Sequence, residues 1–230
     1  MLCRACRLAP PAYERAVAYG LYDGRMRDAI RALKFNGIRP AGRRLGGMLA
    51  QAIASLAGEA PAEMLVIPIP LHRSRHARRG FNQARLLASL SLRQLARTHP
   101  DWRLTLASRA LLRVRATESQ AELTPRQRRL NLRGAFAVSN PAAVAGKNIL
   151  LIDDIMTTGA TVRAASRVLV DAGATSIWVA TLSRARRLNP LRRAALEDAP
   201  DQPAPSSSAH SVRWQADSEY SLHGHSSFSS

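Results

Sequence analysis

Hydrophobic positions follow two different periods along the chain, and their order predicts an α/β fold. Continuous apolar runs of strand length occur at residues 64–69, 149–152 and 176–182. Runs of this kind are typical of parallel strands that are covered on both faces. Between the last two runs, apolar residues recur at helical spacing and end at a glycine that can stop the helix: Val162, Ala165, Val168, Leu169, Ala172 and then Gly173. The order strand, helix, strand predicts a right-handed parallel crossover.

Three more stretches show the helical period. Residues 26–35 space Ile30 and Leu33 for burial. The next stretch places five apolar side chains on one face: Leu45, Leu49, Ala52, Ile53 and Leu56. A further helix is expected over residues 82–95, with three leucines facing inward: Leu86, Leu87 and Leu90. We therefore expect a short N-terminal fragment, a helical lead-in, one α/β domain and a tail, over residues 1–12, 13–40, 41–195 and 196–230.

Two carboxylates, Asp153 and Asp154, follow the run at 149–152 directly. Open α/β sheets bind their ligands at the carboxyl ends of the strands, and adjacent carboxylates can accept hydrogen bonds from two neighbouring ribose hydroxyls. A small loop then precedes the predicted helix, where backbone N–H groups and the helix dipole favour a phosphate: Thr157, Thr158, Gly159, Ala160 and Thr161. We interpret the segment as a sugar-phosphate site. The alternatives are a receiver-like Mg²⁺ site and a merely solvated acid pair.

A second polar segment follows the strand expected at 64–69, so it should lie at the same edge of the sheet. Four arginines crowd it: Arg73, Arg75, Arg78 and Arg79. A guanidinium group can bind phosphate oxygens through two hydrogen bonds; the alternative is a solvated basic turn. The chain has neither the G-x-x-x-x-G-K-[ST] nor the G-x-G-x-x-G pattern, which argues against a P-loop nucleotidase and a Rossmann dehydrogenase.

The segment from Ile149 to Thr161 resembles the signature of type I phosphoribosyltransferases, which bind 5-phosphoribosyl-1-pyrophosphate (PRPP). Residues 33–37, 66–75 and 79–84 are similar to the ComF family, the competence-protein branch that includes GntX-like proteins. So is a later set of positions: Gln120, Leu123, Arg128, Asn131, Gly134, Ala135 and Phe136. The resemblance covers about residues 3–185 and implies a parallel sheet flanked by helices, with a zinc ribbon at its N-terminus.

The resemblance also implies roles for individual residues. The ribose 2′- and 3′-hydroxyls of PRPP would be held by Asp153 and Asp154, and the 5′-phosphate by residues 157–161. Pyrophosphate would contact the basic turn, at His72, Arg73 and Arg79. A mobile loop over the site would span residues 113–136 and contain Gln120, Arg128 and Asn131. Mg²⁺ would accompany PRPP.

Three functions stay open on this basis. The first is a phosphoribosyltransferase of nucleotide metabolism, although no segment identifies an acceptor base. The second is an accessory of natural competence and DNA uptake, which the ComF resemblance implies, with single-stranded DNA and a competence helicase as partners. The third is a regulator that senses PRPP. We expect a ComF-like protein that binds PRPP and Mg²⁺ and acts in competence, and we leave open whether it catalyses a reaction.

The chain is strongly basic, with a formal net charge of +18, and only Lys34 and Lys147 are lysines. Such a surface binds nucleic acid through phosphate contacts alone, so charge permits single-stranded DNA as a partner. Aromatic residues, at 5%, offer few stacking platforms for bases. A GC-rich genome is the alternative reason for so many arginines.

The two cysteines, Cys3 and Cys6, form one C-x-x-C pair. Structural zinc needs four ligands, and ComF-like zinc ribbons have two such pairs. The pair therefore resembles the second half of a ribbon, and we expect either a start codon further upstream or a loss of the metal. His72 and His76 could complete a site, but we favour a place in the pyrophosphate turn for them. A redox role lacks the usual context.

The last 35 residues are rich in serine and proline, and we expect residues 196–230 to be disordered. No apolar run approaches the roughly 18 residues of a membrane span. The first ten residues have charges but no apolar core of a signal peptide. We therefore expect a cytoplasmic protein without a membrane partner.

Overall fold

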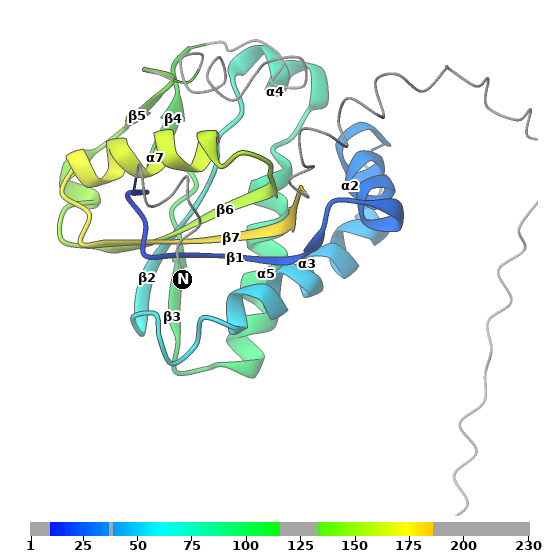
Figure 1. Cartoon of the computed structure of the whole chain (residues 1–230), viewed down its shortest axis with the longest axis horizontal. Coiled ribbons are helices and arrows are strands. Elements are labelled where there is room, and N and C mark those ends of the chain that lie inside the picture. The colour runs from blue at the N-terminus through cyan, green and yellow to red at the C-terminus, as the bar shows by residue number, and fades with distance from the viewer. Residues whose placement is uncertain (1–9, 37–38, 116–131, 133, 186–230) are drawn as a thin grey trace, which may run out of the picture. The chain divides into compact units, whose positions relative to one another are not determined.

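The computed structural model describes residues 10–36, 39–115, 132 and 134–185. Five parallel strands form one sheet in the order β1-β7-β6-β2-β3 (Figure 1). Their bounds are Arg15–Leu21 for β1, Glu63–Pro68 for β2, Arg103–Leu106 for β3, Asn148–Met156 for β6 and Ser176–Arg184 for β7. Since all neighbours run in the same direction, their carboxyl ends share one edge of the sheet.

Helices cover both faces of this sheet (Figure 1). Helices α2 (Gly24–Asn36), α3 (Arg39–Ala54) and α5 (Gln83–Thr98) contribute to the core on one face, and α7 (Ala160–Asp171) packs on the other. A short helix, α4 (Arg73–Arg79), follows β2, and a 3₁₀ turn η1 spans Pro141–Ala143. Strands β4 (Leu111–Arg113) and β5 (Phe136–Val138) form a separate antiparallel pair. The part of the chain that the structure describes contains no helix long and apolar enough to cross a membrane.

The central strand β6 divides its side chains between two hydrophobic cores. Leu150 and Ile152 belong to the core beneath α3 and α5, whereas Ile149 and Leu151 belong to the core beneath α7. All four side chains are fully buried. Successive side chains of a strand point to opposite faces, so the same alternation continues into Asp153 and Asp154. The two carboxylates therefore leave the strand on different sides of the sheet.

Helices α3 and α5 pack closely because a glycine lies at their contact. A Cβ atom built on Gly46 would stand 2.5 Å from the Cβ atom of Leu90. Heavy atoms do not approach so closely, and the neighbour here is the start of a side chain that cannot move without its helix. Gly46 therefore sets the distance between the two helices that carry one face of the core.

The strands predicted at 64–69, 149–152 and 176–182 are confirmed as β2, β6 and β7, and the helices predicted at 26–35, 82–95 and after residue 160 are confirmed as α2, α5 and α7. The helical lead-in expected over residues 13–40 was wrong in its first part, where β1 joins the sheet beside β7. This strand is a mostly half-exposed edge strand in which small residues alternate with larger apolar ones, so no polar positions mark its period of two.

The basic turn expected after Pro70 is instead the helix α4. Its two ends explain why seven residues suffice. The Nδ1 atom of His72 accepts a hydrogen bond from the Ser74 backbone N–H at 3.3 Å, and Gly80 closes the helix in the left-handed conformation at φ 74°. Both caps are present in the sequence, but the four arginines between them favour a solvated basic turn as much as a short helix.

Candidate functional site

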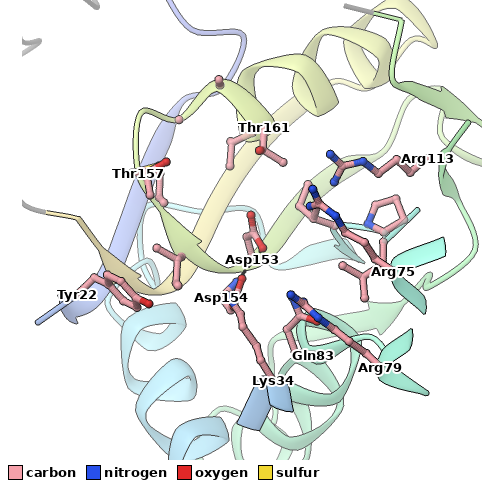
Figure 2. A pocket seen from close by; sticks show the side chains of 18 residues that line it. Tyr22, Lys34, Arg75, Arg79, Gln83, Arg113, Asp153, Asp154, Thr157 and Thr161 are labelled. Carbon is pink, nitrogen blue, oxygen red and sulfur yellow. Dashed lines mark hydrogen bonds and ion pairs between the residues drawn. The ribbon is translucent and has the colours of Figure 1, made fainter. Parts of the chain in front are cut away.

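A pocket of about 300 Å³ lies at the carboxyl end of β6, and residues from several separate parts of the chain line it (Figure 2). Asp153 and Asp154 come from β6, and Lys34 comes from α2. The loop before α7 contributes Thr157 and Gly159, and the first turn of α7 contributes Ala160 and Thr161. The basic side is formed by Arg75, Arg79 and Arg113. In Figure 2 the arginines lie opposite the loop threonines, with Asp153 between them. The pocket thus joins the acid pair and the loop that the sequence predicted.

The two acids have different environments, as the alternation along β6 requires. Asp154 points toward α2, and its Oδ2 atom lies 2.5 Å from the Nζ atom of Lys34. Only 5% of Asp154 is exposed, so this ion pair is largely removed from water. Asp153 is half-buried, and its Oδ1 atom accepts a hydrogen bond from the backbone N–H of Asp154 at 2.9 Å. Both acids line the pocket, and Asp154 is in addition held by the cation of Lys34.

These environments separate the pKa values of the pair. Burial alone would raise the pKa of Asp154, but the charge and hydrogen bond of Lys34 outweigh it and hold that pKa below its ordinary value. Burial and the neighbouring Asp154 carboxylate raise the pKa of Asp153 well above its ordinary value. One acid is thus a fixed anion, and the other is poised to take up or release a proton or to receive donors from a ligand.

The loop between β6 and α7 leads directly into the N-terminus of the helix. Gly159 occupies the N-cap of α7 at φ 75°, in the left-handed region, and contributes no side-chain cap. The backbone N–H of Ala160 lies 3.4 Å from the Oγ1 atom of Thr158, whereas Thr158 itself does not line the pocket. The first N–H groups of a helix have no acceptor inside the helix, so the N-terminal end of α7 favours an anion.

The opposite side of the pocket concentrates positive charge. Arg79 lies 3.4 Å from Gln83 through its Nη1 atom, and the Arg113 guanidinium lies 5.4 Å from the ring centre of Phe136. Burial and then the charges of Arg79 and Arg78 lower the pKa of Arg75. Burial and then Arg75 lower the pKa of Arg113, against the opposing effect of Asp153. Cations that repel one another at a pocket favour the binding of an anion between them.

The structure separates the residues that were predicted to contact pyrophosphate. Arg79 lines the pocket of the acid pair, whereas His72 and Arg73 line a second, larger hollow beside it. Helical spacing accounts for the division, because Arg75 and Arg79 are four residues apart and share one face of α4. His72 also caps the helix, with its Nδ1 atom 2.9 Å from the Ser74 hydroxyl. The pyrophosphate role of these residues stays a prediction.

Four polar residues of the pocket had no individual role assigned from the sequence: Tyr22, Lys34, Gln83 and Arg113. Arg75 was named there as one of the four crowded arginines, without a separate role in binding pyrophosphate. Lys34 lies within a ComF-like segment, but its pairing with a carboxylate 120 positions later leaves no local signal. The predictions for Cys3, Cys6, Gln120, Arg128, Asn131 and the tail fall outside the residues that the structure describes.

Comparisons with known proteins identify the family of the chain. The family model described as the phosphoribosyl transferase domain matches residues 82–202. The DNA utilization protein YhgH of Escherichia coli O157:H7 is 33% identical over 184 residues, covering 79% of this chain and 77% of that protein. Competence protein F of Haemophilus influenzae is 30% identical over 186 residues, with coverages of 80% and 78%. This chain belongs to the ComF family of phosphoribosyltransferase-like proteins.

Another relative, the competence protein ComFC of Bacillus subtilis, is 39% identical over 121 residues, which are 52% of this chain and 44% of that protein. Family membership confirms the predicted fold class, a phosphoribosyltransferase-like parallel sheet flanked by helices.

Proposed function

We propose that this ComF-family protein binds PRPP, or a closely related sugar phosphate, in the pocket at the carboxyl end of β6. The observation that carries the proposal is the placement of three recognition elements around one cavity of about 300 Å³. The acids are acceptors for hydroxyl groups, the start of α7 supplies donors for a phosphate, and the arginines opposite suit a second, more highly charged group. A pentose with a phosphate at one end and a pyrophosphate at the other matches that order.

In this proposal each part of the chain has one role. Asp153 and Asp154 orient the ribose through its 2′- and 3′-hydroxyls, and residues 157–161 hold the 5′-phosphate. Arg75, Arg79 and Arg113 neutralise the pyrophosphate. Arg79 was given this role from the sequence, and Arg75 and Arg113 are given it because they line the same pocket. Lys34 keeps Asp154 ionised, so that Asp154 accepts hydrogen bonds rather than donating one.

The residues fit a magnesium ion that enters with the ligand. Within the described residues there is no group of three or more His, Cys, Asp or Glu side chains that could hold a metal by itself. Mg²⁺ is usually bound through one or two carboxylates together with substrate phosphates, and Asp153 would be the carboxylate available for this. When bound, Mg²⁺ would neutralise part of the pyrophosphate charge and so favour its departure.

Isothermal titration calorimetry with PRPP and Mg²⁺ tests the proposal directly. The double variant Asp153→Asn and Asp154→Asn should lose PRPP binding while its circular dichroism spectrum stays that of the folded protein. Arg97→Gln is a matched control, because this exposed arginine in the last turn of α5 does not line the pocket. Undiminished PRPP binding by a folded double variant would contradict the assigned roles.

Release of pyrophosphate in the presence of candidate bases decides between transfer and sensing. A phosphoribosyltransferase releases pyrophosphate with at least one acceptor, whereas a PRPP sensor binds without turnover.

A role in DNA uptake is the second candidate function. It is supported by the relatives named as a DNA utilization protein and as competence proteins, and by the net charge of +18. In this role the protein would act in the cytoplasm on single-stranded DNA, together with a competence helicase. Deletion of the gene should then lower transformation frequency, and complementation with the parent chain should restore it. An unchanged frequency in a naturally transformable host would contradict the role.

A further inference from the structure

A second hollow, of about 1450 Å³, adjoins the sugar-phosphate pocket. Its lining comes from α3, α4, the start of α5 and the segment at residues 108–114, and we call it the arginine groove. Six arginines line it: Arg43, Arg73, Arg79, Arg85, Arg109 and Arg113. No carboxylate occurs among its lining residues in the described part of the chain. The groove is thus complementary to a polyanion and not to a mixed-charge protein surface.

The groove also exposes apolar side chains between its cations. Leu112 is 43% exposed and Val114 is 57% exposed, and the half-buried Phe81 lies on the lining of the same groove. Apolar side chains of this size are usually covered, and their exposure in a concave surface is typical of a binding site. A ligand that carries both regular negative charges and flat apolar groups satisfies both features. Single-stranded nucleic acid has this chemistry, because its bases are unpaired and can pack on side chains.

Two arginines belong to both cavities. Arg79 and Arg113 line the arginine groove and the sugar-phosphate pocket, together with Pro70 and Leu71. Both arginines are half-buried, whereas the other four arginines of the groove are exposed. Arg113 also lies near enough to Asp153 for their charges to interact. A guanidinium that is engaged by a phosphate group in one cavity is no longer available to a phosphate in the other.

We propose that the arginine groove binds single-stranded nucleic acid and that PRPP competes with it for Arg79 and Arg113. The competition rests on the proposed PRPP site, whereas the nucleic-acid assignment rests on the groove alone. The protein would release nucleic acid when PRPP is abundant and bind it when PRPP is scarce. Because linked binding is reciprocal, saturating nucleic acid lowers the affinity for PRPP by the same factor by which PRPP lowers the affinity for nucleic acid.

Fluorescence anisotropy of a labelled 20-mer of thymidine tests both parts on the full chain. Saturating PRPP and Mg²⁺ should raise the dissociation constant of the 20-mer by about 5- to 100-fold, the range typical of coupled sites. Sodium sulfate at matched ionic strength serves as the reference and should leave a much smaller effect. Calorimetry with PRPP alone is run in parallel, so that a failure to bind PRPP is distinguished from binding without competition.

Variants separate the groove from the pocket. The double variant Arg85→Gln with Arg109→Gln should weaken binding of the 20-mer without changing the affinity for PRPP. The slope of log affinity against log salt concentration should fall by about 0.7 for each lost phosphate contact. Arg113→Gln should weaken the binding of both the 20-mer and PRPP. Arg97→Gln, which removes the same charge about 18 Å along α5 from Arg85, should affect neither ligand.

Each failure has its own meaning. If the 20-mer binds equally with and without PRPP while calorimetry detects PRPP, the competition is refuted. If Arg85→Gln with Arg109→Gln weakens the 20-mer no more than Arg97→Gln does, the groove assignment is refuted. Polyphosphate that matches the 20-mer in affinity per charge would also refute it, since the bases would then contribute nothing. If calorimetry detects no binding of PRPP, the proposed function is refuted and the competition with it. The variants of Arg85 and Arg109 then still test whether the groove binds nucleic acid.

Discussion

Replacement of Lys34 by methionine should destabilise the protein in a way that depends on pH. The variant keeps the aliphatic chain of Lys34 but leaves the Asp154 carboxylate without its partner at 2.5 Å. The side chains of Lys34 and Asp154 are only 17% and 7% exposed, so water cannot replace the lost contact. Removal of one member of a buried ion pair typically costs about 3–5 kcal/mol. Asp154 can limit this loss by taking a proton.

The limit can be worked out from the ordinary pKa of aspartate. At pH 7, protonating a carboxyl group of pKa about 3.9 costs roughly 4 kcal/mol, and at pH 5 it costs about 1.5 kcal/mol. We therefore expect Lys34→Met to lower the free energy of unfolding by about 3–4 kcal/mol at pH 7 and by about 1–2 kcal/mol at pH 5. In the parent chain the pKa of Asp154 is depressed, so its stabilising contribution is lost only as the pH falls through that lower folded pKa.

Guanidinium denaturation followed by circular dichroism at both pH values measures the difference between variant and parent. Lys34→Arg keeps the charge and should lose far less stability, and adding Asp154→Asn to Lys34→Met should recover part of the loss, because no buried charge then lacks a partner. A deficit below about 1 kcal/mol at pH 7, or the same deficit at pH 5 and pH 7, would refute the buried ion pair as described.

Other substitutions test neighbouring features. The raised pKa of Asp153 makes the ligand-free protein lose stability as pH rises through that pKa. Asp153→Asn should remove this decline, so that the variant is more stable than the parent at pH 8 in denaturant titrations. Gly46→Ala should destabilise by about 1–2 kcal/mol, since overpacking against Leu90 exceeds the helical gain of alanine. Gly47→Ala, the matched control, meets only a flexible side chain and should be nearly neutral. Gly159→Ala should weaken PRPP binding in calorimetry, because its φ of 75° disfavours a Cβ atom.

Local patterns in the sequence predicted the central part of the fold and half of the site. The apolar runs that became β6 and β7 are buried on both faces, so hydrophobicity alone marked them. The acids and the following loop were recognisable because one short segment contains both. These features need no information about distant residues.

Features that depend on tertiary contacts escaped the same reasoning. Strand β1 is held by its pairing with β7, more than 150 positions later, and its alternation of small and larger apolar residues has no polar positions to mark it. Lys34 became part of the site only when α2 packed beside the end of β6. Arg113 entered the pocket from the β4 strand, which is three residues long and too short for a periodic signal. What was missed is thus determined by packing between distant segments and not by composition.

The neighbouring carboxylates at the end of β6 line one pocket but have separate environments. The environment of Asp153 depends on the arginine side of the pocket, and that of Asp154 depends on helix α2. The pleat of the strand directs the two side chains into different layers. The same geometry makes the strand intolerant of a shift: inserting a single residue before Asp153 would exchange the two layers and turn both carboxylates away from their present neighbours. Variation in length is therefore expected in the connections around β6 and not within it.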